Sequence, residues 1–193
     1  MPERGKGIQG ERKPNRGPSA GPGNRRALIA AAREVFATEG LQAPFSAVAK
    51  KAGVGQGSLY RHFPDRLSLA VAVFDENLDE LDLAVAPADA TLDDLLDAII
   101  GQVVVSTAFI DLIWHNRHDE RVTHLSDKLA GIVERVLVRE QAAGRLGNHV
   151  ESADVLLAIT MLADVISRAD AAERPDVARR AWSLMHHAFL PRD

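Results

Sequence analysis

Residues 44–66, PFSAVAKKAGVGQGSLYRHFPDR, hold the pattern from which the fold of the chain can be worked out. Val48 and Ala52 lie one helical turn apart and would share a buried face. Gly53 follows directly, and glycine readily adopts the left-handed conformation that ends a helix. The stretch therefore predicts a short helix, a tight turn and a second short helix.

The second of these helices is expected over residues 56–63. Leu59 and Phe63 are four residues apart and would lie on its buried face. The remaining residues are small or hydrogen-bonding and would face outward: Gln56, Gly57, Ser58, Tyr60, Arg61 and His62. Two short helices joined by a glycine-containing turn, the second with a polar outer face, form the arrangement that places a helix in the major groove of DNA.

Residues 52–63, AGVGQGSLYRHF, resemble the helix-turn-helix of the TetR family of transcriptional regulators. In that family the pattern Ala-Gly-Val-x-x-Gly-Ser/Thr-Leu-Tyr-x-His/Tyr-Phe recurs. Residues 31–40 are similar to the usual lead-in, and the resemblance covers residues 24–190, with its specific part in 31–66. It implies a three-helix DNA-binding domain followed by a helical domain for ligand binding and dimerisation.

The chain departs from the family pattern at two places. Members commonly cap the first of the two helices with Ser or Thr, whereas this chain has Pro44 and Phe45, and proline suits the first helical position. Members also often have Ser-Lys where this chain has Gly55 and Gln56. The change removes one possible phosphate contact and adds a side chain that can read adenine bidentately.

The outer face and the resemblance together give a set of expected DNA contacts. Arg66 belongs to this set because the family commonly carries a basic, phosphate-touching residue at the corresponding position. The expected DNA-contacting residues are Ser46, Gln56, Gly57, Ser58, Tyr60, Arg61, His62 and Arg66.

Length and composition limit the class of protein. The 193 residues are 46% hydrophobic, enough for a core in one large or two small domains. No apolar run approaches the eighteen or so residues of a membrane span, and the N-terminus lacks a signal-peptide core. The chain has no cysteine, so disulfides and Cys-based zinc sites are excluded. A cytoplasmic location without membrane contact is the expectation.

Charge is distributed unevenly along the chain. Residues 1–66 contain 12 Lys/Arg and 5 Asp/Glu, whereas residues 67–193 contain 11 and 22, which gives net charges of +7 and −11. Such a division is typical of a protein in which one part approaches a polyanion and the other does not.

Three regions are expected. Residues 1–23 are rich in Gly, Pro, Arg and Lys and read as a disordered basic arm, either a solubilising tail or a segment that follows DNA phosphates. Residues 24–66 form the helix-turn-helix domain, with Asn24 as the N-cap of its first helix. Residues 67–193 form the regulatory and dimerisation domain.

The later part of the chain reads as helices throughout. Pro64 ends the second short helix, and Asp65 caps a long helix with an apolar stripe. Thr91 caps another helix, and a further one extends over about 119–143 until Gly144. No strand-like alternation of useful length occurs, so the predicted fold is all-α.

Two late segments carry more apolar surface than one buried face requires. In residues 152–168 apolar side chains surround almost the whole helix, and residues 176–190 also carry more than one apolar stripe. A four-helix bundle with two helices from each subunit would cover both, which predicts a homodimer. The alternative is a monomer that buries both faces internally.

A ligand cavity is implied by the resemblance, because in TetR-like proteins the helices that carry the chain's scattered aromatic residues surround one. Aromatic walls with a few polar groups are typical of small-molecule sites. The expected ligand-binding residues are Phe74, Asn77, Phe109, Trp114 and His115.

Metal binding and catalysis are less favoured. Asp111, His115 and His118 have the spacing of a chelating helix face, yet such a group is more often a solvated edge or the polar wall of a pocket. No phosphate-binding loop and no recognisable nucleophile motif occurs. We therefore expect no metal, no cofactor and no enzymatic activity.

The hypothesis is a DNA-binding transcriptional regulator, a repressor that a small-molecule ligand releases from a palindromic operator. Its partners would be double-stranded operator DNA, a second copy of the chain and an unidentified effector. The alternative is a helical small-molecule or metal-binding module, or an enzyme, whose helix-turn-helix is non-functional. The polar outer face of residues 56–62 argues against that alternative.

Overall fold

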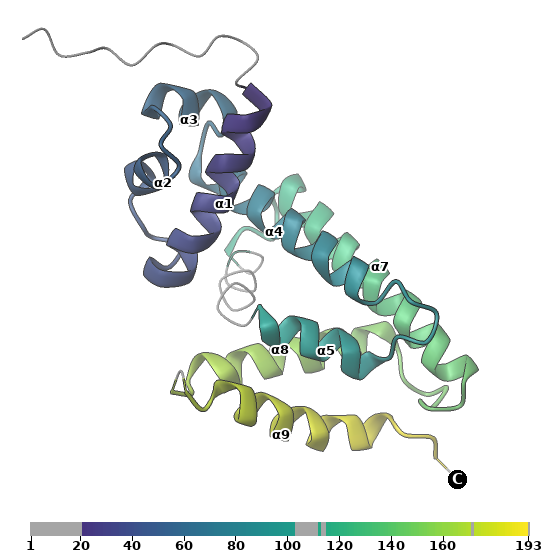
Figure 1. Cartoon of the computed structure of the whole chain (residues 1–193). Helices are drawn as coiled ribbons and strands as arrows, with labels where there is room; N and C mark the ends of the chain where they lie inside the picture. The colour runs from purple at the N-terminus through teal and green to yellow at the C-terminus, as the bar shows by residue number, and fades with distance from the viewer. Residues whose placement is uncertain (1–20, 103–111, 113–114, 171, 193) are drawn as a thin grey trace, which may run out of the picture.

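The computed structural model describes residues 21–102, 112, 115–170 and 172–192, and every regular element in these ranges is helical (Figure 1). The elements are α1 (Gly21–Glu39), α2 (Phe45–Lys51), α3 (Gln56–His62), α4 (Arg66–Ala84), α5 (Leu92–Gly101), α7 (Glu120–Ala142), α8 (Ser152–Ser167), α9 (Arg174–His186) and the 3-10 turn η2 (His187–Phe189). The predicted all-α class is confirmed. Within the described ranges, no helix has the length and apolar character needed to cross a membrane.

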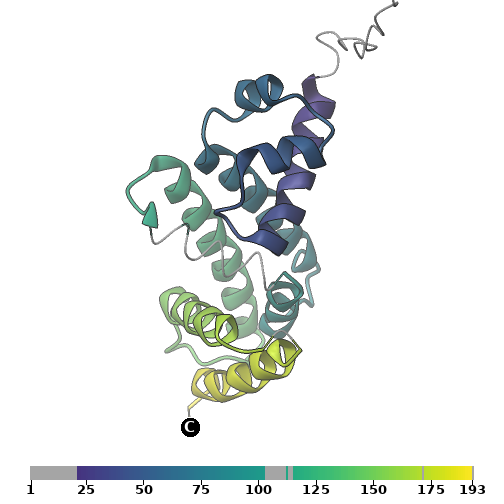
Figure 2. The same cartoon turned by 90° about the vertical axis from the view of Figure 1, so that its left-hand side faces the viewer.

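Helices α1, α2 and α3 form a head at one end of the molecule (Figures 1 and 2). Its centre is apolar and fully buried, with Leu28, Val48 and Leu59 contributed by the three helices in turn. The expected start of the first helix at Asn24 is wrong, because α1 already begins at Gly21. Asn24 therefore lies inside the helix, where its side chain points toward α3 instead of capping.

Helix α4 connects the head to the body, the name used here for α5, α7, α8 and α9 (Figure 1). Asp65 caps α4 as predicted: its Oδ1 accepts from the Ser68 backbone N–H at 2.6 Å, and the Ser68 Oγ accepts from the Asp65 N–H in return. This capping box fixes where α4 begins relative to α3. The direction of α4 thus sets the position of the head over the body.

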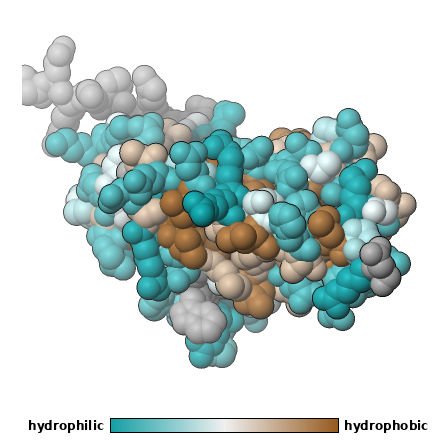
Figure 3. Space-filling model, turned by 90° about the horizontal axis from the view of Figure 1, so that it is seen from below, coloured by the Kyte–Doolittle hydropathy of each residue, from teal (hydrophilic) through white to brown (hydrophobic). Residues whose placement is uncertain are grey.

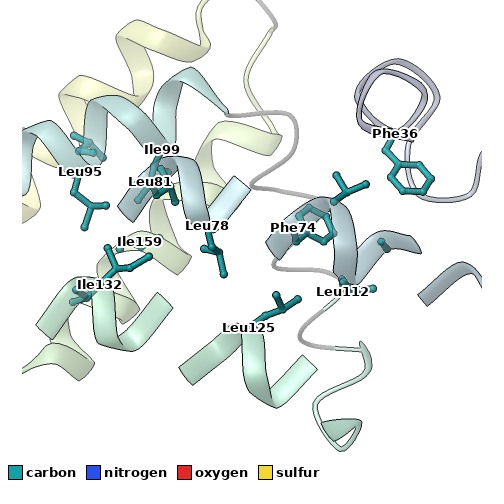
Figure 4. Packing of buried hydrophobic residues seen from close by; sticks show 14 of the residues in the cluster. Phe36, Phe74, Leu78, Leu81, Leu95, Ile99, Leu112, Leu125, Ile132 and Ile159 are labelled. Carbon is teal, nitrogen blue, oxygen red and sulfur yellow. The ribbon is translucent and has the colours of Figure 1, made fainter. Parts of the chain in front are cut away.

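Helix α7 of the body packs along α4, and Figure 4 shows the apolar core of this contact at close range. Phe74, Leu78 and Leu81 of α4 are buried with Leu125 and Ile132 of α7. At the edge of this contact, the Lys128 Nζ lies 2.6 Å from carboxylate oxygens of both Asp75 and Asp79. An ammonium held by two carboxylates across the edge of an apolar contact favours one alignment of the two helices.

Helices α8 and α9 pack side by side at the end of the molecule opposite the head. Trp182 of α9 is buried and donates its Nε1–H to the Asp93 Oδ1 in the first turn of α5, at 2.7 Å. This bond satisfies the polar end of a large buried ring. It also attaches α9 to the rest of the body.

Candidate DNA-binding surface and ligand cavity

Helix α3 is held by two buried anchors and leaves its outer face in solvent. Leu59 is 1% exposed and Phe63, at the C-cap of the helix, 2% exposed. On the outer side of the helix four residues are exposed: Gln56, Gly57, Tyr60 and Arg61. Ser58 and His62 are half-buried, and Ser46, in the first turn of α2, is exposed. The expected recognition face is therefore available to a partner along most of its length.

The turn between α2 and α3 has the geometry that the glycine pattern predicts. Gly53 has φ +65°, which L side chains rarely adopt, and its N–H donates to the Lys50 carbonyl at 3.2 Å. The Val54 N–H then donates to the Ala49 carbonyl at 3.0 Å. These two bonds close the end of α2 and direct the chain into α3.

Phe45 supports Tyr60 from the neighbouring helix. Their rings meet edge to face with centroids 5.3 Å apart, and Tyr60 remains largely exposed. Such pairs add about 0.5–1.5 kcal/mol beyond the burial of their area. Phe45, which departs from the usual capping residue, thus restrains an outward Tyr60, whereas Pro44 serves as the N-cap of α2 without a side-chain bond.

Helix α1 contributes to the same end of the head. The Asn24 Nδ2 lies 3.5 Å from the Ser58 Oγ, a long hydrogen bond that orients Ser58. The Arg25 guanidinium lies over the Phe63 ring, 5.5 Å from its centroid, next to the C-terminal end of α3. Sequence analysis did not include Asn24 or Arg25 in the site, because nothing in their own spacing relates them to α3.

Arg66 does not face outward as expected. Its Nη1 donates to the Leu41 carbonyl at 2.5 Å and to the Ala43 carbonyl, both in the turn between α1 and α2. The side chain is half-buried at the start of α4. In this structure Arg66 supports the turn between α1 and α2, and the phosphate contact inferred from the resemblance stays a prediction.

Replacing Arg66 with alanine is expected to destabilise the head by about 1–3 kcal/mol, because two carbonyls of the turn lose a charged donor. The dependence of log K on log salt for DNA binding should stay unchanged, whereas a lost phosphate contact would lower its slope by about one. Thermal unfolding and a salt titration measure the two effects. Arg61→Ala is the comparison, since its exposed side chain should lower the slope without lowering Tm. If the slope fell in Arg66→Ala while Tm stayed the same, the result would instead support a phosphate contact by Arg66.

An acidic group links the head to the body at the start of α4. The Asp65 carboxylate accepts from the Arg121 Nη1 with both oxygens at 3.2 Å, and Asp119 pairs with the same guanidinium at 2.8 Å. The Ser68 N–H holds the pKa of Asp65 below its usual range, with Arg121 adding to the effect against desolvation. Hydrogen bonds from Arg121 lower the pKa of Asp119 to about 2. Both carboxylates are therefore ionised at neutral pH and fix Arg121 of α7 beside the α4 cap.

The expected ligand-binding residues are only partly brought together. Phe74 and Asn77 are buried in α4, and Asn77 is 5% exposed with no partner for its Nδ2 in the part of the chain that the structure describes. His115 is exposed beyond the body core. Phe109 and Trp114 lie outside the described residues. The proximity of all five therefore stays a prediction.

A cavity of about 600 Å³ lies at the junction of head and body. Its described walls come from α1, the α1–α2 turn, the first turns of α4, the end of α8 and the start of α9, with Leu112, His115 and Asn116 between α5 and α7. Of the expected ligand-binding residues, His115 lines this cavity, whereas Phe74 and Asn77 do not. Phe36, Leu41, Leu67, Leu112, Arg66 and Arg174 supply its larger side chains.

The far face of the body carries exposed apolar side chains. Leu157 is 59% exposed and Met161 52% exposed on α8, and Leu184 of α9 is 72% exposed. Figure 3 shows apolar residues gathered in the middle of this face and framed by hydrophilic ones. Leu157 and Met161 are one turn apart, so α8 presents a continuous apolar row on the side away from its own core.

The three residues with the spacing of a chelating helix face do not form a metal site among the residues that the structure describes. Asp111 lies outside the described residues, and His115 and His118 are exposed. Over the ranges that the structure describes, no group of three His, Cys, Asp or Glu side chains could hold a metal ion.

Comparison with known proteins connects this geometry to a family. The model of bacterial regulatory proteins of the tetR family matches residues 28–73, which cover most of the head and the start of α4. None of the curated proteins with which the chain was compared matches it.

Solved structures similar to the chain include a TetR transcriptional regulator from Streptomyces coelicolor, with 25% identity, a TM-score of 0.66, and coverage of 88% of this chain and 99% of that one. A regulatory protein TetR from Rhodobacter sphaeroides has 16% identity, a TM-score of 0.66, and coverage of 86% and 99%. A gamma-butyrolactone receptor described as ArpA-like has 18% identity, a TM-score of 0.59, and coverage of 89% and 90%. Nearly the full length of each structure therefore shares this fold.

Proposed function

We propose that this chain is a member of the TetR family of bacterial regulatory proteins and acts as a homodimeric repressor, and that a small-molecule ligand lowers its affinity for a palindromic operator. That it is a DNA-binding transcriptional regulator follows from the family. The observation that carries the proposal is the outer face of α3, which stays polar and exposed although its inner face is fully buried. A helix that served packing alone would not need such a face, so the helical binding module or enzyme is not favoured.

DNA recognition is assigned to the first turn and outer face of α3. Gln56 is exposed at its N-terminus, where a side-chain amide can pair with the N6 and N7 of an adenine. Gly57 and Ser58 beside it are small enough to let the helix approach the base edges. The next residues of α3 would contact the flanking phosphates, namely Tyr60, Arg61 and His62. Ser46, on the neighbouring helix α2, would do the same.

Dimerisation is assigned to α8 and α9. Leu157, Met161 and Leu184 expose a large apolar surface that a second copy of the same face would remove from water. Two-fold symmetry would then give two heads with two copies of α3. A two-fold protein matches a palindromic operator, with half-sites one helical turn or a multiple of it apart.

Ligand control is supported by the cavity between head and body, because its volume lies within the range of small-molecule sites. One structure with this fold is a gamma-butyrolactone receptor. A ligand lowers operator affinity only through its preference for the conformation that does not bind DNA. A tenfold loss of affinity needs about 1.4 kcal/mol of such coupling.

Selection of binding sites from random double-stranded DNA with the purified protein tests the proposal. The expected product is a palindrome, and the Gln56→Ala variant should lose preference at one base pair in each half-site while binding the rest. Transcription in vitro from a promoter that overlaps the selected site should fall when the protein is added. No enriched sequence, or an enriched site without symmetry, would contradict the proposal.

A further inference from the structure

The cavity at the junction is lined by apolar side chains and by two arginines. Phe36 of α1, Leu67 of α4 and Leu112 give it apolar sides (Figure 4 shows Phe36 and Leu112 at the side of the core nearest α1). Arg66 and Arg174 bring two guanidinium groups to it from two different helices, since Arg66 begins α4 and Arg174 begins α9. We propose that this cavity binds a small organic anion with an apolar body, and that Arg66 transmits its occupancy to the helix-turn-helix. The inference rests on the proposed function, because it names the ligand class of that regulation.

The charge of the described walls selects the ligand. Two arginines line the cavity, and none of the described lining residues is Asp or Glu. Arg174 is half-buried and uses its Nε to donate to the Ala169 carbonyl at 3.3 Å, while its terminal nitrogens meet no partner among the described residues. A guanidinium in this position offers a bidentate site for a carboxylate, a sulfonate or a similar oxyanion. The apolar sides would bury the rest of the molecule.

Arg66 connects the cavity directly with the DNA-binding head. The same guanidinium that lines the cavity donates to the Leu41 and Ala43 carbonyls, which form the turn before α2. An anion that draws Arg66 toward itself competes with these two carbonyls for the same donor. The turn that positions α2, and through it α3, then loses its brace. Ligand and head are thus coupled through one side chain, without requiring a displacement of the whole of α4.

Binding can be tested with a fluorescent apolar anion, 8-anilinonaphthalene-1-sulfonate, and with the uncharged N-phenyl-1-naphthylamine of similar shape. The full chain is expected to bind the sulfonate at one site per subunit. Arg174→Gln should weaken this binding about tenfold and leave the uncharged probe within threefold, because only a charge-assisted contact is lost. Ala37→Phe, which fills the cavity from an exposed position on α1, should weaken both probes at least tenfold.

The matched control is Arg179→Gln on the surface of α9, whose partner Asp176 lies 3.5 Å away outside the cavity. It removes the same charge and should change neither probe. Sulfonate binding that is the same in wild type, Arg174→Gln and Ala37→Phe would overturn the site. The operator selection described above is independent of the probes, so that result would leave the proposed regulator standing.

The relay is tested by operator binding with saturating sulfonate. Affinity for the selected operator is expected to fall about tenfold in wild type and to stay unchanged in Ala37→Phe. Hydrogen exchange at the Leu41 to Ala43 turn should rise with the probe bound, since its carbonyls lose their common donor. Sulfonate that binds in the cavity but changes neither operator affinity nor exchange would overturn the role of Arg66.

Discussion

Replacing both Leu157 and Met161 with glutamate is expected to convert the proposed dimer into monomers and to lower affinity for a palindromic operator at least a hundredfold. The two side chains are largely exposed in one subunit, so the subunit itself should fold normally. In the proposed four-helix interface each glutamate would be buried without a partner, at a cost of several kcal/mol. Two such changes per subunit exceed what a modest apolar interface can compensate.

The loss of operator affinity follows from the loss of the second head. In a dimer the second half-site is bound at a high effective concentration, and a monomer has no such advantage. Sedimentation equilibrium measures the oligomeric state, and fluorescence anisotropy with labelled operator measures the affinity. Circular dichroism should show unchanged helix content.

Leu83→Glu is the matched control, because Leu83 is 73% exposed on α4, away from α8 and α9. It should remain a dimer and bind operator as wild type. Met185 lies in the second of the two apolar segments, but it is half-buried and packed against the core, so a charge there would disturb folding as well. Dimers that persist in the double variant would place the interface elsewhere.

Local patterns predicted much of the fold because the relevant forces act within a few residues. Gly53 occurs where the backbone needs a positive φ, and Asp65 occurs where α4 needs an acceptor for its first N–H groups. The apolar spacing around Leu59 and Phe63 gave the inner face of α3. The all-α class and the position of the exposed outer face of α3 follow from these features.

Contacts between distant segments could not be predicted in the same way. Arg66 has the position and charge of a phosphate-binding residue, but its direction depends on two carbonyls 23 and 25 residues earlier in the chain. The junction cavity combines α1 with Arg174 of α9, and no local spacing relates them. Sequence analysis placed the start of α1 at Asn24 instead of Gly21 for a different reason. Asn24 is a good cap in isolation, yet helix formation continues back to Gly21, with Pro22 suited to the first turn.

Replacing Gly57 with glutamate is expected to abolish operator binding, by a hundredfold or more, while the protein stays folded. A Cβ added at Gly57 would meet nothing within 4 Å, and the residue is exposed in the first turn of α3. The head therefore has room for the new side chain. In the complex, however, the carboxylate would occupy the space of the base edges and face the phosphates with like charge.

Gly57→Ala separates the effect on stability from the effect on binding. Alanine is the better helix former by about 0.5–1 kcal/mol, so this variant should unfold at a higher temperature than wild type. Its single methyl group should reduce operator affinity far less than glutamate does. Differential scanning calorimetry and anisotropy with labelled operator give the two quantities for each variant.

Gly131→Glu on α7 controls for the added charge. A Cβ there would lie 3.8 Å from the Arg135 Nη1, an ordinary contact, and the new carboxylate would be one turn before that arginine. This variant changes the net charge of the protein by the same amount as Gly57→Glu but lies in the middle of α7, outside the head, so its operator affinity should equal that of wild type. If Gly57→Glu also bound operator as wild type does, the first turn of α3 could not enter the major groove. Recognition would then have to come from another part of the head.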